Sequence, residues 1–379
     1  MRRVAVAGVG LIKVKEYWDK SVTQLFSEAA LQAMENAGTD DIDQLYVSNM
    51  SGALQQNQLN MGALMADAIG KPGIPATRIE AASASGGLAF HEGVKAVASG
   101  YSDCVLVGGV EKLSDALPDV VNTSLVMAEE QEYTAYTGVT KIGLSAMLHR
   151  MYMDQYASPE EVGMMAVKSH DHAVGCRHAQ YPFRMSIDRA LDSPMEADPI
   201  HMMECAGIGD GAAAIVLCPA GKECVEVAGS AVATDLCGLP QRVNPLEFTA
   251  VKSAAMKAYE MARVKSKDVN VVEVQDDVTI NGVLSLEALG LADKGKGAKM
   301  VFEGGTARDG KAPTNTFGGL KARGNPLGAT GVYQVAEVAL QLMGKAGDNQ
   351  VEGAEVGLAQ NMGGLASICS VNILRRLGK

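Results

Sequence analysis

Two stretches far apart in this chain of 379 residues follow the same pattern. Residues 29–38 read Ala-Ala-Leu-Gln-Ala-Met-Glu-Asn-Ala-Gly, and residues 41–47 continue with Asp-Ile-Asp-Gln-Leu-Tyr-Val. Residues 254–263 read Ala-Ala-Met-Lys-Ala-Tyr-Glu-Met-Ala-Arg, and residues 268–274 continue with Asp-Val-Asn-Val-Val-Glu-Val. Each stretch predicts an amphipathic helix, a short turn with an acidic residue and a buried strand. Two copies are too few for a solenoid, so the recurrence predicts a pseudo-twofold duplication, with chance similarity between two amphipathic helices as the alternative.

The segments around the first copy alternate between strand and helix. Apolar runs predict strands at residues 4–9, 44–49 and 104–109. Apolar side chains at helical spacing predict helices at residues 21–37 and 59–69. This alternation is typical of a parallel sheet covered by helices on both faces, so we expect an α/β fold with such a sheet.

The middle of the chain breaks the alternation. Met-rich and His-rich helical pieces, separated by Pro and Asp turns, occupy residues 111–200 and predict an inserted loop domain. Strands predicted at residues 212–217 and 225–231 close the first half and open the second. The expected organisation is therefore a first half of residues 1–110 and 201–224, a loop domain of residues 111–200, and a second half of residues 225–379.

Composition limits the classes of partner and compartment. The formal net charge is −11 with no long basic run, which argues against nucleic acid and anionic membrane surfaces as partners. No apolar run approaches the roughly 18 residues of a membrane span. Seven cysteines are scattered without a Cys-x-x-Cys pair, so neither a disulfide framework nor a metal site is expected. A reducing compartment fits this pattern best, and we expect a cytoplasmic protein.

Three turns rich in small residues are candidate ligand sites. They read Glu-Ala-Ala-Ser-Ala-Ser-Gly-Gly at residues 80–87, Asn-Thr-Phe-Gly-Gly-Leu-Lys-Ala-Arg-Gly-Asn-Pro-Leu-Gly-Ala-Thr-Gly at residues 315–331, and Gln-Asn-Met-Gly-Gly at residues 360–364. A turn of small residues before a helix lets a ligand approach the backbone, where free N–H groups and the helix dipole stabilise negative charge. Such turns suit the oxyanion of a thioester, although each one alone is also explained by glycines that allow close packing.

Together, and in this order, the turns resemble the thiolase family, in particular the branch of archaeal acetyl-CoA acetyltransferases and sterol-carrier-protein-type thiolases. The resemblance extends to Val-Ala-Val-Ala-Gly-Val-Gly at residues 4–10, Gly-Gly-Val-Glu-Lys-Leu-Ser-Asp at residues 108–115, and Asp-Gly-Ala-Ala-Ala at residues 210–214. It implies the thiolase fold, with two pseudo-twofold-related βαβαβαββ halves in a layered αβαβα arrangement plus the inserted loop domain. It also implies at least a homodimer, with CoA or acyl-CoA as ligand in a pantetheine tunnel and no tightly bound cofactor.

The chain departs from this family at the positions that carry its chemistry. Ser83 stands where these thiolases have the nucleophilic cysteine, and a serine hydroxyl needs a strong adjacent base. Gln275, Asn325 and Gln360 stand where they have histidines, and the six histidines of this chain lie elsewhere. Amides keep their hydrogen-bonding capacity but transfer no protons, so Claisen chemistry that depends on Cys and His is expected to be absent.

Asp277 replaces a cysteine that acts as an acid and base in the relatives. A carboxylate in an apolar tunnel has a raised pKa and can serve as a base. The alternative is that Asp277 caps the helix predicted at residues 279–289, because Asp is a preferred N-cap residue. The resemblance also implies an oxyanion hole formed by the backbone N–H groups of Ser83 and Gly363.

Phe317, Gly318 and Gly319 are the predicted CoA-binding residues. The resemblance places this turn at the tunnel, where Phe317 replaces a small residue and either narrows the tunnel or packs against an acyl group. A core aromatic that simply fills space is the alternative for Phe317.

Two principal interpretations follow for function. In the first, the chain is a pseudoenzyme that binds acyl-CoA as a subunit of an acyl-CoA-processing complex, and the resemblance implies a small OB-fold, zinc-ribbon protein as partner. In the second, it is an active enzyme that forms or cleaves a C–C bond of an acyl-CoA through Asp277, with the backbone oxyanion hole retained. A third interpretation is a serine acyltransferase acting through Ser83.

Overall fold

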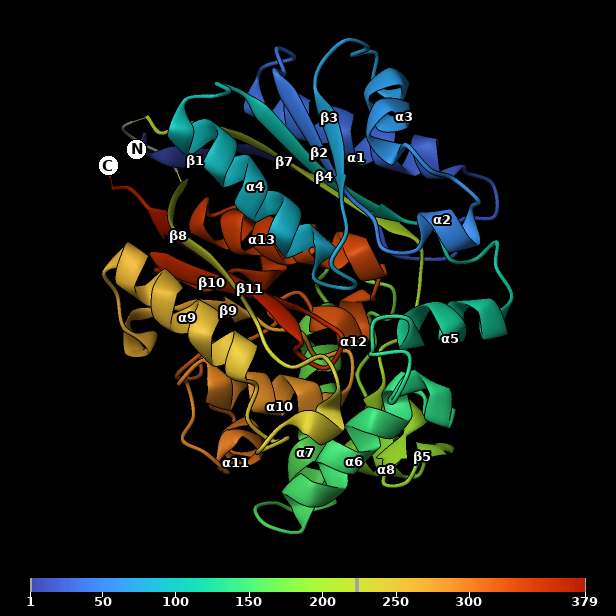
Figure 1. The fold of residues 1–379 in the computed structure, drawn as a ribbon. Coiled ribbons are helices and arrows are strands. Elements are labelled where there is room, and N and C mark those ends of the chain that lie inside the picture. Colours follow the sequence, from blue (N-terminus) through green and yellow to red (C-terminus); the bar gives the residue numbers. More distant parts are fainter. Residues whose placement is uncertain (1, 222–224, 379) are drawn as a thin grey trace.

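The computed structural model describes residues 2–221 and 225–378, which form two similar halves with a loop domain beside them (Figure 1). The limits predicted for the halves at residues 1, 222–224 and 379 lie outside the described residues. The strands of the first half are β1 (Val4–Leu11), β2 (Gln44–Ser48), β3 (Ala76–Ile79), β4 (Val105–Glu111) and β7 (Gly211–Pro219). Those of the second half are β8 (Val225–Thr234), β9 (Val271–Glu273), β10 (Val356–Gly363) and β11 (Ile368–Arg376).

The helices begin and end where local capping chemistry favours it. Helix α1 (Val22–Ala37) starts with a capping box, in which the Ser21 hydroxyl accepts a hydrogen bond from the Gln24 N–H and the Gln24 side chain accepts one from the Ser21 N–H. It stops at Gly38, whose φ of +67° is the left-handed conformation that glycine adopts most easily. The other helices of the two halves are α2 (Gly52–Gln55), α3 (Met61–Ala68), α4 (Ser85–Ser99), α9 (Thr249–Ala262), α10 (Thr279–Ala288), α11 (Gly297–Phe302), α12 (Gly319–Arg323) and α13 (Thr330–Leu342).

The strands of both halves join in one nine-stranded sheet with the order β3-β2-β4-β7-β1-β8-β11-β10-β9. The two halves meet where β1 pairs with β8 in antiparallel register. Read outward from this pair, the order β1-β7-β4-β2 mirrors the order β8-β11-β10-β9, and α1 and α9 occupy matching places. The predicted duplication is therefore visible in the topology.

The expectation of a parallel sheet is wrong for its centre. Strands β3, β2 and β4 are parallel, as are β9 and β10, but every pairing from β4 through β1 and β8 to β10 is antiparallel. Strand β11 follows β10 after a short turn, which allows only an antiparallel pairing. Strand β7 returns from the loop domain and inserts between β4 and β1, a long-range step that local alternation of helices and strands does not encode.

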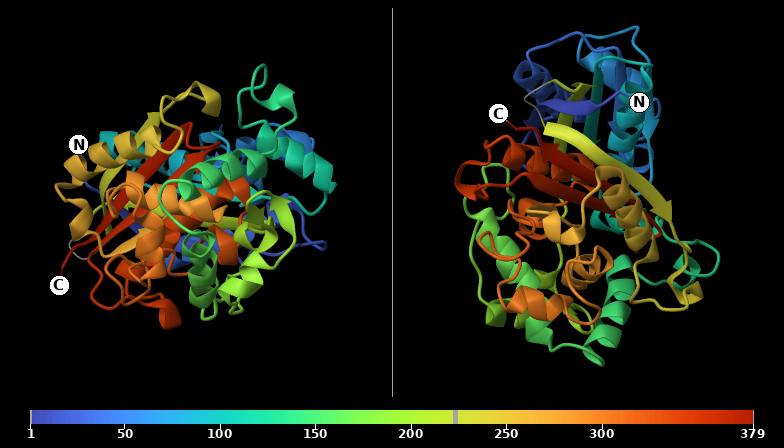
Figure 2. Two further views of the ribbon diagram at one scale, coloured as in Figure 1. Left: turned by 90° about the horizontal axis from the view of Figure 1, so that it is seen from below. Right: turned by 90° about the vertical axis from the view of Figure 1, so that its left-hand side faces the viewer.

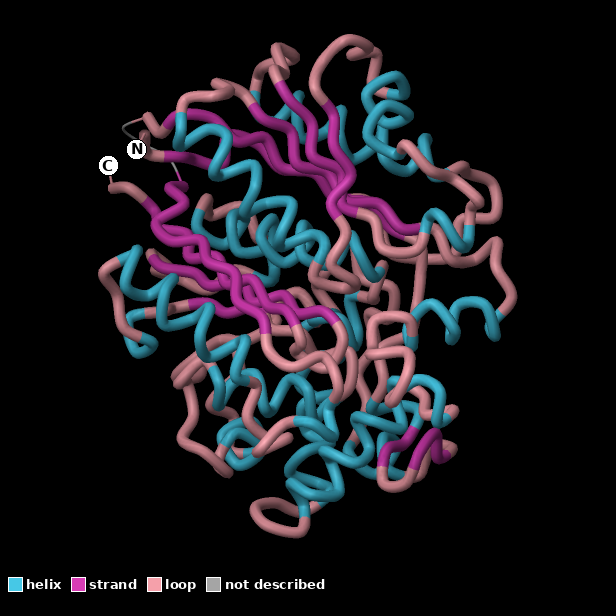
Figure 3. Tube along the Cα trace, in the orientation of Figure 1, coloured by secondary structure: helices cyan, strands magenta, loops and turns pink. Residues whose placement is uncertain are grey.

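The elements stack in five layers (Figures 1–3). Helices α1 and α3 cover the outer face of the first half, and α9 covers the outer face of the second. Helices α4 and α13 lie between the two groups of strands and contact both, because α4 packs on β4 and β11 while α13 packs on β7 and β10. This is the layered α/β arrangement of the thiolase fold, as predicted.

Glycines let the two central helices approach each other at their N-termini. A Cβ atom at Gly86 would lie 2.7 Å from the Val332 nitrogen and 2.8 Å from the Gly331 Cα, closer than side-chain carbons approach. The same crossing brings the Gly87 N–H within 3.0 Å of the Asn361 Oδ1 on β10. The small residues of the first and second turns thus serve close packing as well as access to the backbone.

The loop domain lies beside α10 and α11 (Figure 1). It consists of helices α5 (Pro118–Val126), α6 (Lys141–Met153), α7 (Pro159–Ala173) and α8 (Ile187–Leu191) and of the short hairpin β5 (Met195–Ala197) and β6 (Ile200–His201). Helices α6 and α7 contact α10, and α7 also contacts α11 and α12. The insertion therefore packs on the part of the second half that carries Gln275 and Asp277.

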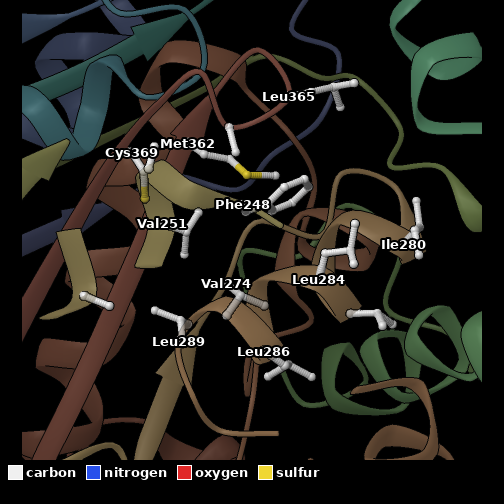
Figure 4. Packing of buried hydrophobic residues seen from close by; sticks show 14 of the residues in the cluster. Phe248, Val251, Val274, Ile280, Leu284, Leu286, Leu289, Met362, Leu365 and Cys369 are labelled. Carbon is white, nitrogen blue, oxygen red and sulfur yellow. The ribbon is translucent and has the colours of Figure 1, made fainter. Parts of the chain in front are cut away.

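One apolar cluster supports the turn between β10 and β11 (Figure 4). Met362, Leu365 and Cys369 from this turn are buried in the same cluster as Phe248 before α9 and Leu284 of α10. Packing of this kind fixes the backbone of the turn relative to the start of α10. Within residues 2–221 and 225–378, no helix is long and apolar enough to cross a membrane, and no group of His, Cys, Asp or Glu side chains is arranged to hold a metal ion.

Candidate active site

Ser83 lies in the tight turn between β3 and α4. Its side chain is buried at 1% exposure, and the preceding residue Ala82 has a φ of +51°, which is strained for a residue with a Cβ atom. The Ser85 hydroxyl holds the turn, because it donates to the Ala82 carbonyl at 2.5 Å and accepts from the Ala81 N–H at 2.9 Å. The strained turn that presents the side chain of residue 83 at the start of α4 is thus formed with a serine at this position.

The Ser83 hydroxyl has no base beside it. Its one hydrogen-bonding neighbour among the described residues is the Met50 sulfur at 4.0 Å. Burial lowers the pKa of His149 to about 4, of His170 to about 4 and of His172 to about 3, so these three imidazoles are neutral at pH 7. None of the six histidines bonds to Ser83 within the described ranges. The hydroxyl therefore lacks the activation that covalent acyl transfer requires.

A network of amides connects Ser83 to two other predicted site residues. The Asn361 Nδ2 group donates to the Ser83 carbonyl at 3.0 Å and to the Gln275 Oε1 at 2.8 Å. The Gln275 backbone N–H donates to the Gln360 Oε1 at 2.9 Å, and the Gln360 Nε2 group lies 3.8 Å from the Cys369 sulfur. The structure therefore connects Ser83, Gln275 and Gln360 through hydrogen bonds near the end of β10, with Asn361 between Ser83 and Gln275.

The Gln275 side chain has one orientation and one free donor. Its Oε1 also accepts from the Met362 backbone N–H at 3.0 Å, and because a backbone N–H can only donate, the atom it meets must be the oxygen. The Nε2 group then points away from these partners, and it is buried without a hydrogen-bond partner in the described part of the chain. A buried amide donor left open in this way is suited to a carbonyl oxygen or oxyanion of a ligand.

Asn325 lies in a different part of the pocket wall. Its Oδ1 accepts from the Thr330 hydroxyl at 3.0 Å, and its backbone pairs with Ile208 of the strand that leads into β7. No hydrogen bond joins it to Ser83 or Gln275 among the residues that the structure describes. Asn325 thus keeps the turn after α12 attached to the first half.

The two neighbouring aspartates have different surroundings. Asp276 accepts from the Leu320 N–H at 2.6 Å and from the Ser169 hydroxyl at 2.9 Å, so it anchors the first turn of α12. Burial raises the pKa of Asp276, and the nearby Lys168 opposes this. Asp277 is instead bound by a cation, because the Lys141 ammonium contacts its Oδ2 in a buried ion pair.

The alternative that Asp277 caps α10 is wrong. The N-cap residue of α10 is Val278, and no side chain bonds to the start of the helix. The second oxygen of Asp277, Oδ1, accepts from the Asn281 Nδ2 at 3.0 Å. The carboxylate therefore bonds to side chains of α6 and α10 rather than to the helix N-terminus, with Lys141 as a partner that the sequence did not indicate.

The turn at Gly363 and Gly364 closes the site. The Gly363 carbonyl accepts from the Ser367 N–H at 3.1 Å, and Gly364 has a φ of +57°. A Cβ atom at Gly363 would collide with the Ala81 carbonyl, so only glycine lets this turn approach the Ser83 turn. The role of the Gly363 N–H as an oxyanion donor stays a prediction.

Phe317, Gly318 and Gly319 begin the turn that leads into α12. Gly318 and Gly319 have φ values of +108° and +57°, and a Cβ atom at Gly319 would lie 2.5 Å from the Asp276 carboxylate. Phe317 packs among Ala173, Cys176 and Ala179, with its ring centroid 5.3 Å from that of His178, and it lines a cavity of about 430 Å³. Contact of these three residues with CoA stays a prediction.

Two charged residues of the site were missed by sequence reasoning. Lys141 is the first residue of α6, directly after the N-cap Thr140, and Glu129 follows α5. Lys141 lies 136 positions before the aspartate it pairs with. No sequence pattern connects such distant residues, although an acidic or basic residue in a Met-rich insertion could have been noted as a candidate for a buried pair.

The fold is that of the thiolases, and the chain belongs to the thiolase family. Residues 8–221 match the family described as thiolase, N-terminal domain, and residues 231–376 match the thiolase C-terminal domain-like family. The chain is 43% identical to an acetyl-CoA acetyltransferase of Methanothermobacter thermautotrophicus over 99% of this chain and 100% of that protein. It is 30% identical to human sterol carrier protein 2 over 96% of this chain and 70% of that protein. These matches confirm the predicted family and its two branches.

Among solved structures, the chain resembles one described as Ltp2-ChsH2(DUF35) aldolase. The TM-score is 0.86 with 21% sequence identity, and the match covers 100% of this chain and 98% of the other. At this level of identity the similarity shows the fold alone.

Proposed function

We propose that this chain binds a CoA thioester without forming an acyl-enzyme and makes or breaks the bond between C2 and C3 of its acyl group. The observation that carries the proposal is the free Nε2 donor of Gln275, which is buried beside Ser83 and fixed in direction by the Met362 N–H. A donor held in place before the reaction stabilises the charge that develops on a thioester oxygen when C2 becomes an enolate. Ser83, with no base beside it, takes no covalent part.

Aldol-type chemistry fits the groups present better than Claisen chemistry. Thiolytic Claisen cleavage requires a nucleophile that accepts the acyl group, whereas aldol cleavage requires only an enolate-stabilising donor and groups that move protons. The site offers the Gln275 amide and the ion pair of Lys141 with Asp277, and these side chains are buried. The solved structure described as Ltp2-ChsH2(DUF35) aldolase supports this proposal, because its name gives an aldolase with a similar fold.

Turnover of a set of thioesters tests the proposal. The purified protein is incubated with 3-hydroxyacyl-CoA, 3-oxoacyl-CoA and acetyl-CoA substrates, and products are identified by liquid chromatography with mass spectrometry. Gln275→Met, which keeps the length and removes the donor, is expected to lower kcat by about 100-fold to 1000-fold while CoA affinity is retained. Gln44→Met is the matched control, because Gln44 is a buried glutamine bonded to Ser102 and Tyr46 away from the site.

Other outcomes identify the competing interpretations. A covalent acyl adduct mapped to Ser83 would replace the proposal with the serine acyltransferase. CoA binding without turnover of any thioester would leave a pseudoenzyme that serves as the acyl-CoA-binding subunit of a complex.

We also propose that the chain works as a cytoplasmic homodimer that associates with a small OB-fold, zinc-ribbon subunit. The name of the structural neighbour, Ltp2-ChsH2(DUF35) aldolase, supports a small partner for this fold. The test is co-expression with the OB-fold, zinc-ribbon protein of the same genome, followed by light scattering and zinc analysis of the purified complex. A zinc-free homodimer that excludes the co-expressed protein would contradict the partner.

A further inference from the structure

Glu129 is a buried carboxylate with very few partners, since the Leu365 N–H is the one hydrogen-bond donor that acts on it in the described part of the chain. It follows α5 in the loop domain, where its backbone N–H donates to the Val126 carbonyl at 2.9 Å. Its side chain is buried at 3% exposure, and neither Oε1 nor Oε2 has a hydrogen-bond partner in the described part of the chain. An unsatisfied buried carboxylate destabilises the folded chain, so its presence calls for a ligand or a chemical role.

The carboxylate lies against the turn that closes the active site. A Cβ atom at Gly364 would lie 3.2 Å from the Glu129 Oε1 and 3.1 Å from the Ala128 carbonyl. Two residues earlier on β10, the Met362 N–H holds the Gln275 side chain. Gly364 follows the last residue of β10, so Gln275 and Glu129 approach the chain two residues apart, at Met362 and at Gly364.

The charges around Glu129 connect it to the rest of the site. Burial raises the pKa of Glu129, and the positive charges of Lys141 and Arg242 act in the opposite direction. Arg242 is engaged elsewhere, since it donates to the Leu365 carbonyl at 2.6 Å and to the Leu236 carbonyl. Lys141 acts on Glu129 through its charge while its ammonium pairs with Asp277.

Glu129 is better placed than Asp277 to exchange protons with a substrate. Both oxygens of Asp277 are occupied, one by Lys141 and the other by the Asn281 Nδ2 at 3.0 Å. Glu129 makes no hydrogen bond of ordinary geometry within the described residues, where the Leu365 N–H is the one donor that acts on it. Asp277 therefore holds the Lys141 ammonium in position, and Glu129 is the free carboxylate of the group.

We propose that Glu129 is a further catalytic residue, which exchanges a proton with the oxygen on C3 of the acyl thioester while Gln275 holds the oxygen on C1. This assignment rests on the proposed function and adds the group that the proposed chemistry still needs. It also defines the substrate class as thioesters with an oxygen on C3.

The proton and electron balance closes without any other reactant. In the cleavage direction, the C3 hydroxyl gives its proton to the Glu129 carboxylate, and the oxygen's electron pair forms the C3 carbonyl. The C2–C3 bond breaks, and its electrons form an enolate whose oxygen is held by the Gln275 Nε2 group. The Lys141 ammonium protonates C2, and Glu129 returns its proton to Lys141.

The test compares the wild-type chain with Glu129→Gln, Glu129→Asp and Glu132→Gln. Glu132 lies three positions further along the same loop and is exposed, so its variant controls for effects on the loop. Turnover of a 3-hydroxyacyl-CoA is measured as a function of pH, and CoA affinity is measured by calorimetry. We expect Glu129→Gln to lower kcat by about 100-fold to 10,000-fold with unchanged CoA affinity. Glu129→Asp should recover part of the activity.

The pH profile separates a chemical role from a structural one. In the wild type, turnover should fall on the acid side as Glu129 takes up a proton, at a pH above the ordinary range of glutamate because burial raises its pKa. This acid limb should be absent from the residual activity of Glu129→Gln. If Glu129→Gln retains activity within threefold, or keeps the limb, the assignment of Glu129 is overturned and the proposed function stands. If the wild type turns over none of the thioesters, both the proposed function and the assignment of Glu129 are wrong.

Discussion

Two buried glutamates differ in their surroundings: Glu111 lies at the end of strand β4, and Glu129 lies in the loop domain. Glu111 ends β4, and its carboxylate accepts five hydrogen bonds, from the Asn49 Nδ2, the Met50 N–H, the Ser51 N–H and hydroxyl, and the Gly328 N–H. Glu129 accepts none of ordinary geometry from the described residues, and only the Leu365 N–H acts on it as a donor. Burial raises the pKa of both groups, and at Glu111 the hydrogen bonds from Met50, Ser51 and Gly328 oppose the shift.

This difference separates a structural carboxylate from a functional one. Glu111 joins β4, the segment after β2 and the turn before α13, and each of its lone pairs is used inside the protein. Glu129 leaves its oxygens for a partner that comes from outside. Asp277 lies between these cases, because a single cation and one amide satisfy it.

The largest effect is expected from removing the cation between the two site carboxylates. Lys141→Met leaves Asp277 buried without its partner, and breaking a buried ion pair in this way costs about 3 to 5 kcal/mol of the free energy of unfolding. Urea denaturation followed by circular dichroism measures the loss. The double variant Lys141→Met/Asp277→Asn should recover most of it, because no uncompensated charge remains. A loss below about 1 kcal/mol in the single variant would show that Asp277 is solvated rather than buried with its cation.

A somewhat smaller loss is expected at the satisfied glutamate. Glu111→Gln places an NH₂ group against the Met50 or Gly328 N–H, so at least one buried donor loses its acceptor, at about 2 to 3 kcal/mol. The same denaturation experiment measures it, with exposed Glu352→Gln as the control. Equal stability of the two variants would mean that the five hydrogen bonds to Glu111 contribute nothing beyond those made with water.

The fold was predictable because its signals are local. The capping Ser21, the glycine after α1 and the repeated helix-strand unit all act within about 20 residues, and the structure contains each of them. Strand direction was not predictable, because β7 takes its place only after the whole loop domain has been crossed. The pairing of β7 with both β1 and β4 is set by packing between distant segments.

The same division applies to the site. Ser83 and Gln360 were predicted from turns of recognisable composition and Gln275 from the family resemblance, and the amide network joins the three residues. Glu129 and Lys141 belong to an irregular insertion, where nothing in the sequence indicates which charged residue becomes buried. Their roles depend on contacts made across the fold with the turn after β10 and with Asp277.

The smallest effect, and the one with opposite sign, is expected at the unsatisfied glutamate. Glu129→Gln replaces a buried carboxylate by a neutral group of the same shape, so at pH 7 it should raise the free energy of unfolding by about 1 to 2 kcal/mol. A gain in stability together with a loss of turnover is the expected behaviour of a residue kept for function. Glu132→Gln should change neither.

The pH dependence of this gain tests its cause. The pKa of Glu129 is higher in the folded chain than in the unfolded chain, where it is about 4.3, so folding favours the protonated form. Below the unfolded pKa both states carry the proton, and wild type and Glu129→Gln should be equally stable. At higher pH the unfolded wild type releases the proton freely, whereas the folded wild type must either keep the proton or bury a charge. The folded wild type therefore loses stability relative to the variant as the pH rises through the raised pKa. The difference in Tm should therefore grow from about zero below the unfolded pKa to its full value once the pH exceeds the raised pKa of the folded chain. A constant difference at every pH would attribute the gain to packing rather than to ionisation, and a more stable wild type at pH 7 would show that Glu129 is satisfied within the protein, as Glu111 is.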